Sequence, residues 1–250
     1  MKKSKAAAYT EQEARRDLVA ALRSAERLGL AEGVCNHFSL AVPGKAGQFL
    51  INPQGLHWSE VTPADLVVVD GNGKHISGRH TVEPTAFFIH GRIHRAHPRA
   101  CCVLHTHMPY ATTLTLIQGG ELAWASQNAL RFHGRVAYDD VYNGLALSAA
   151  EGDRMAARLR DADVLFLANH GVIVCGPSVA HAFDDLYYLE RACLLQVLAH
   201  GTGKALRLVP DGVARETRAQ MDAEREQSEL HLAALKRILD RDQPGWDRLK

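Results

Sequence analysis

Short apolar segments that follow one another in pairs are the feature that most restricts the possible folds of this chain. Residues 35–44 and 47–55 are separated by a Pro-Gly turn, and Asp-Gly-Asn-Gly, a hairpin signal, follows the apolar run that ends at Asp70. Residues 163–171 and 172–176 form another pair. Strands paired in this way differ from the regular strand–helix alternation of a doubly wound parallel sheet. The pattern predicts a mostly antiparallel or mixed sheet with helices on both faces.

Six segments have the apolar spacing and the end signals of helices. The first begins after Thr10, a candidate N-cap, and the longest begins after Ser178. The others are expected over residues 83–98, 108–118 and 148–162 and in the charged segment after Pro210. Because apolar residues are sparse in that last segment, we expect it to pack on a partner or at a subunit edge. We predict a single domain over residues 1–250, with a charged helical extension from about residue 205.

The composition excludes several classes of function. The net charge is +1 and only 6% of the residues are aromatic, which disfavours a nucleic-acid surface and a charged membrane surface. No N-terminal apolar segment resembles a signal peptide, and no apolar run approaches the roughly 20 residues that span a bilayer. The five cysteines form no C-x-x-C pair and are expected to be reduced thiols. We therefore expect a cytoplasmic protein with no nucleic-acid or membrane partner.

Three histidines lie where strands are predicted to end. His105 and His107 follow an apolar run, and since side chains alternate along a strand they project to the same side. A pair of surface histidines at a strand end is the alternative explanation. His170 follows a second apolar strand in Asn169-His170-Gly171, where the glycine is expected to supply the turn conformation. Three imidazoles from two strand ends predict a catalytic site for one divalent ion, with Zn, Mn, Co and Fe all compatible.

The other histidines are expected mainly on the surface, including His94 on a charged helical face. His90 is expected to pack beneath the site from its helix, and His37 and His133 are further candidates for the site.

Five segments in order resemble the class II aldolase / adducin family over residues 14–200. They read GVCNHFSLAVPG, FLINPQGLHWSEVTPADLVVVD, PTAFFIHGRIHRAHPRACCVLHTH, LFLANHGVIVCG and AFDDLYYLERACLLQ. The resemblance implies a three-layer α/β/α sandwich around a mostly antiparallel sheet, assembled as a homotetramer. It also implies that His105, His107 and His170 hold one divalent ion, and that Asn36 and Gly55 line the substrate pocket.

One segment departs from the sugar-phosphate aldolases of that family. Those enzymes carry Ser-Ser-Glu where this chain has Pro84-Thr85-Ala86, so their phosphate-binding serines and their catalytic glutamate are both missing. Glu83 is the nearest carboxylate to that position. The departure disfavours a phosphorylated substrate. This segment of the chain instead resembles that of two other branches of the family. One comprises the metal-dependent decarboxylases and lyases of hydroxylated aromatic acids, and the other is the non-catalytic head domain of adducin.

We therefore expect a metal-dependent lyase that decarboxylates a hydroxylated aromatic or heteroaromatic acid. Glu83, His37 and Tyr138 are the candidate acid–base residues, and Arg131 is a candidate clamp for a substrate carboxylate. The alternatives are an aldolase acting on a non-phosphorylated hydroxy-keto acid, an adducin-like binding module, and a redox reaction at Fe(II).

Overall fold

A single eight-stranded sheet forms the centre of the computed structural model, which describes residues 9–249. The strands are β1 (His37–Ala41), β2 (Gln48–Ile51), β3 (Val67–Asp70), β4 (His75–Ser77), β5 (Cys102–Thr106), β6 (Val136–Asp139), β7 (Val164–Leu167) and β8 (Gly171–Gly176). They lie in the order β4-β3-β2-β1-β5-β8-β7-β6. Every neighbouring pair is antiparallel except β6 and β7, which run parallel. The predicted mostly antiparallel sheet is confirmed.

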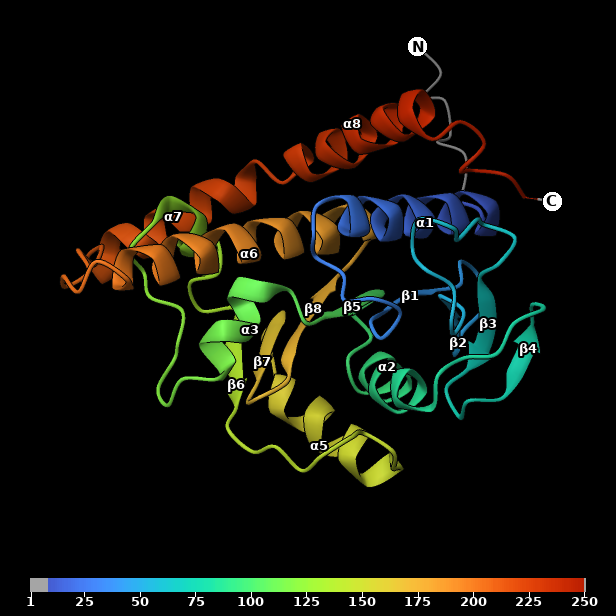
Figure 1. Ribbon diagram of the computed structural model, residues 1–250, viewed down its shortest axis with the longest axis horizontal. Helices are drawn as coiled ribbons and strands as arrows, with labels where there is room; N and C mark the ends of the chain where they lie inside the picture. Colours follow the sequence, from blue (N-terminus) through green and yellow to red (C-terminus); the bar gives the residue numbers. More distant parts are fainter. Residues whose placement is uncertain (1–8, 250) are drawn as a thin grey trace, which may run out of the picture.

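Helices cover both faces of this sheet (Figure 1). They are α1 (Glu11–Arg27), α2 (Pro84–Ala96), α3 (Pro109–Thr115), α4 (Gln127–Leu130), α5 (Ala149–Leu159), α6 (Val179–His200), α7 (Asp211–Ala223) and α8 (Glu226–Asp242). In Figure 1, α1, α6 and α8 lie above the sheet and α2 and α5 lie below it. The three-layer α/β/α architecture expected from the family resemblance is therefore present.

Side-chain alternation along β5 divides the core into two main parts. Leu104 is buried in a large cluster with α1 and α6, whereas Val103 is buried in a second cluster with Ile89 and Ile93 of α2. His105 has the same parity as Val103, so its ring projects toward the α2 face. The strand that carries the first predicted metal ligand is therefore fixed by apolar packing on both faces.

The charged C-terminal segment packs on its own chain through α8, and its expected contact with a partner or a subunit edge stays a prediction. Helix α8 crosses α1 and α6, and it buries Leu232 and Leu239. Polar contacts make up for the sparse apolar residues: Arg225, at the start of α8, forms an ion pair of 2.7 Å with the fully buried Asp185 of α6. Within residues 9–249, no helix is long and apolar enough to cross a membrane.

Candidate metal centre

The three predicted histidines converge at one end of the sheet. His105 lies on β5, His107 follows that strand directly, and His170 lies in the short turn between β7 and β8. Because β8 pairs with β5 along its whole length, the start of β8 lies beside the end of β5. The imidazole centroids are 4.8–5.0 Å apart, and one nitrogen from each ring lies within 4.8 Å of the others. Among the described residues, they form the one group of three side chains arranged to hold a metal ion.

Hydrogen bonds fix which nitrogen of two rings faces the centre of the group. His105 Nδ1 lies 3.0 Å from the carbonyl oxygen of Val172, and His107 Nδ1 lies 2.5 Å from Oε2 of Glu32. Both partners can only accept, so Nδ1 carries the proton in each ring, and in the neutral rings the lone pair is on Nε2. The two Nε2 atoms are 3.2 Å apart. Two lone pairs that face each other at this distance repel, and a cation between them would be coordinated, so the residues fit a divalent ion.

Burial keeps two of these imidazoles neutral, as metal ligands must be. Burial is the main cause that holds the pKa of His105 well below its usual value, and the neighbouring histidines lower it further. Burial and the proximity of His107 lower the pKa of His170 to about 4. A neutral imidazole offers a lone pair to a metal, whereas an imidazolium does not.

Close packing, and not a turn, explains the glycine after His170. Asn169 has the left-handed conformation, with φ of 57°, and Gly171 is already part of β8. A Cβ atom at Gly171 would lie 2.5 Å from the carbonyl oxygen of Thr106 and 2.9 Å from Cδ2 of His107. The prediction that Gly171 provides the turn conformation was therefore wrong, because asparagine provides it. The missing side chain instead lets β8 approach β5 beside the triad.

A pair formed by the buried His37 and the partly exposed Glu83 adjoins the triad. The ring of His37 on β1 stacks on His105, with centroids 5.3 Å apart, and its Nε2 lies 3.0 Å from Oε2 of Glu83. Burial lowers the pKa of His37 although Glu83 opposes this, and the hydrogen bond from His37 lowers the pKa of Glu83. Both directions agree with a neutral imidazole that donates to a carboxylate. Glu83 precedes α2, where its side chain does not cap the helix but faces His37.

A second set of histidines lies between α2 and β1, next to His37, whose ring centroid is 5.6 Å from that of His90. His94 Nδ1 donates to the carbonyl oxygen of Ala100, so the Ser39 hydroxyl donates to His94 Nε2 at 2.7 Å. Ser39 Oγ then accepts from His90 Nδ1 at 2.6 Å. The expectation that His94 is solvated was wrong, since both of its ring nitrogens are bonded inside the protein. His90 is completely buried, as expected for a residue that packs under the site.

Asn36 is buried, whereas Gly55 lies in an exposed turn. Asn36 is buried directly before His37, its Oδ1 accepts from the Glu32 amide, and its Nδ2 has no partner within residues 9–249. Gly55 has φ of 79° in an exposed turn, a conformation that favours glycine.

The structure does not bring Tyr138 or Arg131 to the triad. The Tyr138 hydroxyl accepts from the Leu122 amide at 2.9 Å, and its ring stacks on Phe166. Burial raises the pKa of this phenol well above its usual value. Arg131 donates to Asp184 at 2.7 Å, on the stretch of α6 where α8 is anchored. His133 also lies elsewhere, 2.9 Å from Asp211 at the start of α7.

Glu32 is the site residue that sequence reasoning missed. It lies in the exposed loop between α1 and β1, about 75 residues from the histidine that it contacts. The only sequence signal was its position four residues before Asn36, directly before the segment that contains this pocket residue.

Comparisons with known proteins agree with this fold. The model of the Class II Aldolase and Adducin N-terminal domain matches residues 16–197. An aldolase class 2 protein of Pseudomonas aeruginosa is 33% identical over 242 residues, which cover 94% of this chain and 92% of that protein. Decarboxylase NovR of Streptomyces niveus is 33% identical over 226 residues, which cover 88% of this chain and 83% of that protein.

A solved structure extends the similarity to three dimensions. The crystal structure of an aldolase II superfamily protein from Pseudomonas syringae has a TM-score of 0.88 to this chain at 36% identity, and the match covers 95% of this chain and 96% of the other. Together, the matching family model and these relatives show that the chain belongs to the class II aldolase and adducin family.

Proposed function

We propose that the chain is a divalent-metal-dependent carbon–carbon lyase that decarboxylates a hydroxylated aromatic or heteroaromatic acid. The observation that carries the proposal is the convergence of three imidazoles, two with their Nε2 lone pairs toward each other, beside the His37–Glu83 pair. His105, His107 and His170 would hold one Zn, Mn, Co or Fe ion. When bound, the ion supplies a Lewis acid that stabilises negative charge on a substrate oxygen next to the bond that breaks.

The residues around the triad favour a substrate without phosphate. Thr85 occupies the place of a phosphate-binding serine in the sugar-phosphate aldolases, but its hydroxyl donates to Glu83 Oε1 at 2.7 Å. A carboxylate this close to a phosphate dianion would repel it. Ala86, at the place of the family glutamate, is buried among apolar residues that include Phe49 and Val67.

Decarboxylation suits the acid–base groups that are present. The carboxylate leaves as CO₂, the bonding electron pair stays on the ring carbon, and one proton takes the place of the lost group. In our proposal the His37–Glu83 pair holds and delivers that proton, because the carboxylate stabilises the imidazolium through which the proton would pass. Asn36, whose buried Nδ2 is free to donate, is proposed to contact the substrate, and Gly55 to shape the adjacent turn.

The similarity to the decarboxylase NovR supports decarboxylation, and membership of the class II aldolase family keeps aldol cleavage as the alternative. The test is a panel of hydroxylated aromatic acids and hydroxy-keto acids, incubated with the protein and Zn²⁺, Mn²⁺, Co²⁺ or Fe²⁺. Release of CO₂ that disappears in His105→Ala supports our proposal. Release of an aldehyde or a ketone instead establishes the aldolase alternative, and no turnover of either class with any of the four metals favours the adducin-like binding module.

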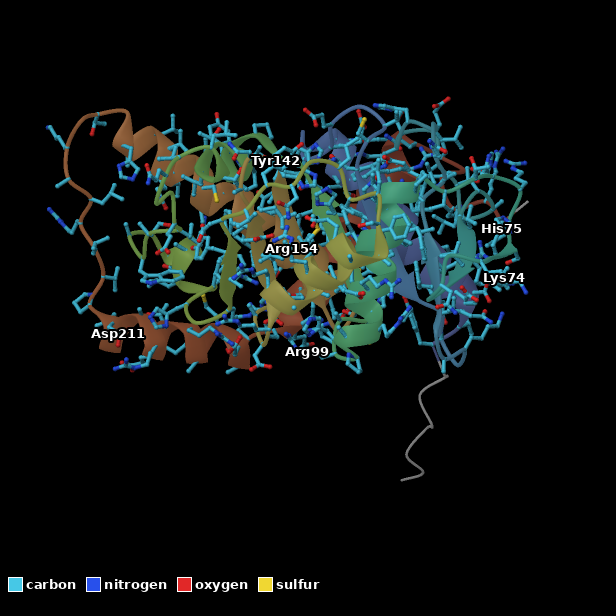
Figure 2. The ribbon with its side chains drawn as sticks, turned by 90° about the horizontal axis from the view of Figure 1, so that it is seen from below. Lys74, His75, Arg99, Tyr142, Arg154 and Asp211 are labelled. Carbon is cyan, nitrogen blue, oxygen red and sulfur yellow. The ribbon has the colours of Figure 1, made fainter. Side chains whose placement is uncertain are left out.

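We also propose a homotetramer that binds its small-molecule substrate near subunit boundaries. Apolar side chains are exposed in the loop before α5, including Leu145, Leu147 and Tyr142, and Figure 2 labels Tyr142 on that loop. The Tyr142 ring lies 6.4 Å from that of His170. Exposed apolar groups next to a site favour coverage by another subunit. Light scattering should give about 110 kDa, four times the 27.4 kDa of one chain, and a monomer mass would contradict the assembly.

A further inference from the structure

We infer that Glu32 is a positioning residue of the metal centre, which orients His107 and strengthens its bond to the divalent ion. This inference rests on the proposed function, because it requires that His107 is a ligand. It adds a residue outside the three histidines and the His37–Glu83 pair.

The contact between Glu32 and His107 has the geometry that a metal-binding imidazole needs. Oε2 of Glu32 lies 2.5 Å from Nδ1 of His107, on the side of the ring opposite to Nε2. A carboxylate there holds the proton on Nδ1, limits rotation of the ring and makes Nε2 a stronger donor to a cation. His105 has only the neutral carbonyl of Val172 in the same position. Glu32 therefore gives one ligand a charged partner that the other lacks.

The backbone around Glu32 is fixed although its side chain is exposed. The Glu32 amide donates to Oδ1 of Asn36 at 2.9 Å, and the Cys35 amide donates to the Glu32 carbonyl at 3.1 Å. Asn36 is itself buried, and its carbonyl accepts from Nδ2 of Asn52 at 3.2 Å. These bonds connect the loop to the start of β1 and so place the carboxylate over His107.

An ordinary surface ion pair would explain the same contact without any role at the metal. The side chain of Glu32 is 63% exposed, and exposed pairs contribute little to stability. The two explanations differ in what the carboxylate changes. A surface pair leaves metal affinity and the tautomer of His107 as they are, whereas a positioning residue changes both.

The test measures the affinity for Zn²⁺ by competition with a chelator in the full-length protein. It compares the native protein with Glu32→Ala, Glu32→Gln and His107→Ala. Glu216→Ala is the matched control, because Glu216 is an exposed glutamate of α7. We expect Glu32→Ala to weaken Zn²⁺ binding about 10-fold or more, the usual effect of losing an outer-sphere partner. Glu32→Gln keeps an oxygen that accepts from Nδ1 but loses the charge, so its affinity should lie between those of Glu32→Ala and the native protein, and the control should bind as the native protein does.

A second readout does not depend on metal. Nitrogen-15 NMR of the metal-free protein should show the His107 proton on Nδ1, and the population with the proton on Nε2 should increase in Glu32→Ala. Affinity in Glu32→Ala within twofold of the native protein, with the tautomer unchanged, would refute the inference while His107→Ala still loses Zn²⁺. Unchanged affinity in His107→Ala would instead refute the proposed metal site and this inference with it.

Discussion

Replacing Gly171 by alanine should disturb the candidate metal centre without removing any ligand. The new Cβ atom would lie 2.5 Å from the Thr106 carbonyl oxygen, which is roughly 0.9 Å inside the 3.4 Å at which ordinary contact begins. This oxygen belongs to the sheet backbone, so it cannot rotate away as the end of a flexible side chain would. Strand β8 must therefore move away from β5, or the His107 ring must turn, since its Cδ2 lies 2.9 Å from the same position.

The size of the effect follows from the neighbouring hydrogen bond. If β8 takes up the whole displacement, the 3.0 Å bond from His105 Nδ1 to Val172 lengthens by roughly 0.9 Å and is lost. That loss costs about 1 kcal/mol, and overpacking of a close strand contact typically costs about 1–3 kcal/mol. We expect the free energy of unfolding to fall by about 2–4 kcal/mol and Zn²⁺ affinity to fall as well.

Urea denaturation and Zn²⁺ competition measure the two effects separately. Gly212→Ala is a matched control, because a Cβ atom there meets no neighbour in the first turn of α7. It should leave metal affinity unchanged and stability equal or slightly higher. A Gly171→Ala protein with native stability and native Zn²⁺ affinity would refute the argument that close approach of β8 to β5 is what requires glycine there.

Three further predictions test other parts of the molecule. Burial favours a higher pKa for Asp65, but hydrogen bonds, from Thr62 first, hold it at about 2 in the folded protein against 3.8 in a free residue. Asp65 therefore stabilises the fold above about pH 4, and this contribution of about 1–2 kcal/mol is lost as the pH falls toward 2. Asp65→Asn should make the free energy of unfolding depend less on pH between about 4 and 2, as measured by circular dichroism. Asp185→Asn should lower the free energy of unfolding by about 3 kcal/mol in urea, because it removes the buried carboxylate with which Arg225 and the buried Arg135 both pair. A loss below about 1 kcal/mol would show that these ion pairs do not anchor α8. Tyr138→Phe should lower the free energy of unfolding by about 1 kcal/mol, because it removes the hydrogen bond to the Leu122 amide, and it should leave kcat unchanged. A large loss of turnover would restore Tyr138 as a candidate acid.

The layers of the fold could be predicted from local signals. Turn residues between apolar segments predict the hairpins β1–β2 and β3–β4, and alternation along β5 predicts two histidines on one side. Helix α1 was predicted from its capping residue, and in the structure Thr10 and Glu13 form the complete capping box. Signals of this kind depend on neighbours in sequence, so one chain is enough to identify them.

Contacts between distant segments could not be predicted in the same way. Glu32 meets His107 only after β1 pairs with β5, and nothing near Glu32 in the sequence indicates that partner. Arg131 was expected to bind a substrate carboxylate, but its guanidinium pairs with Asp184 of α6 at 2.7 Å and with Asp185 at 3.3 Å. A charged residue shows what it can bind, and the tertiary structure decides which partner it meets.

Metal content is the most direct test of the central claim, that His105, His107 and His170 hold a divalent ion. The untagged protein, purified without chelator, would be analysed for metals beside a His105→Ala/His170→Ala double variant, with circular dichroism to show that both are folded. We predict about one divalent ion per native chain and almost none in the variant. Native protein that binds no Zn²⁺, Mn²⁺, Co²⁺ or Fe²⁺ even after loading, or a folded variant that retains the full complement, would contradict the claim.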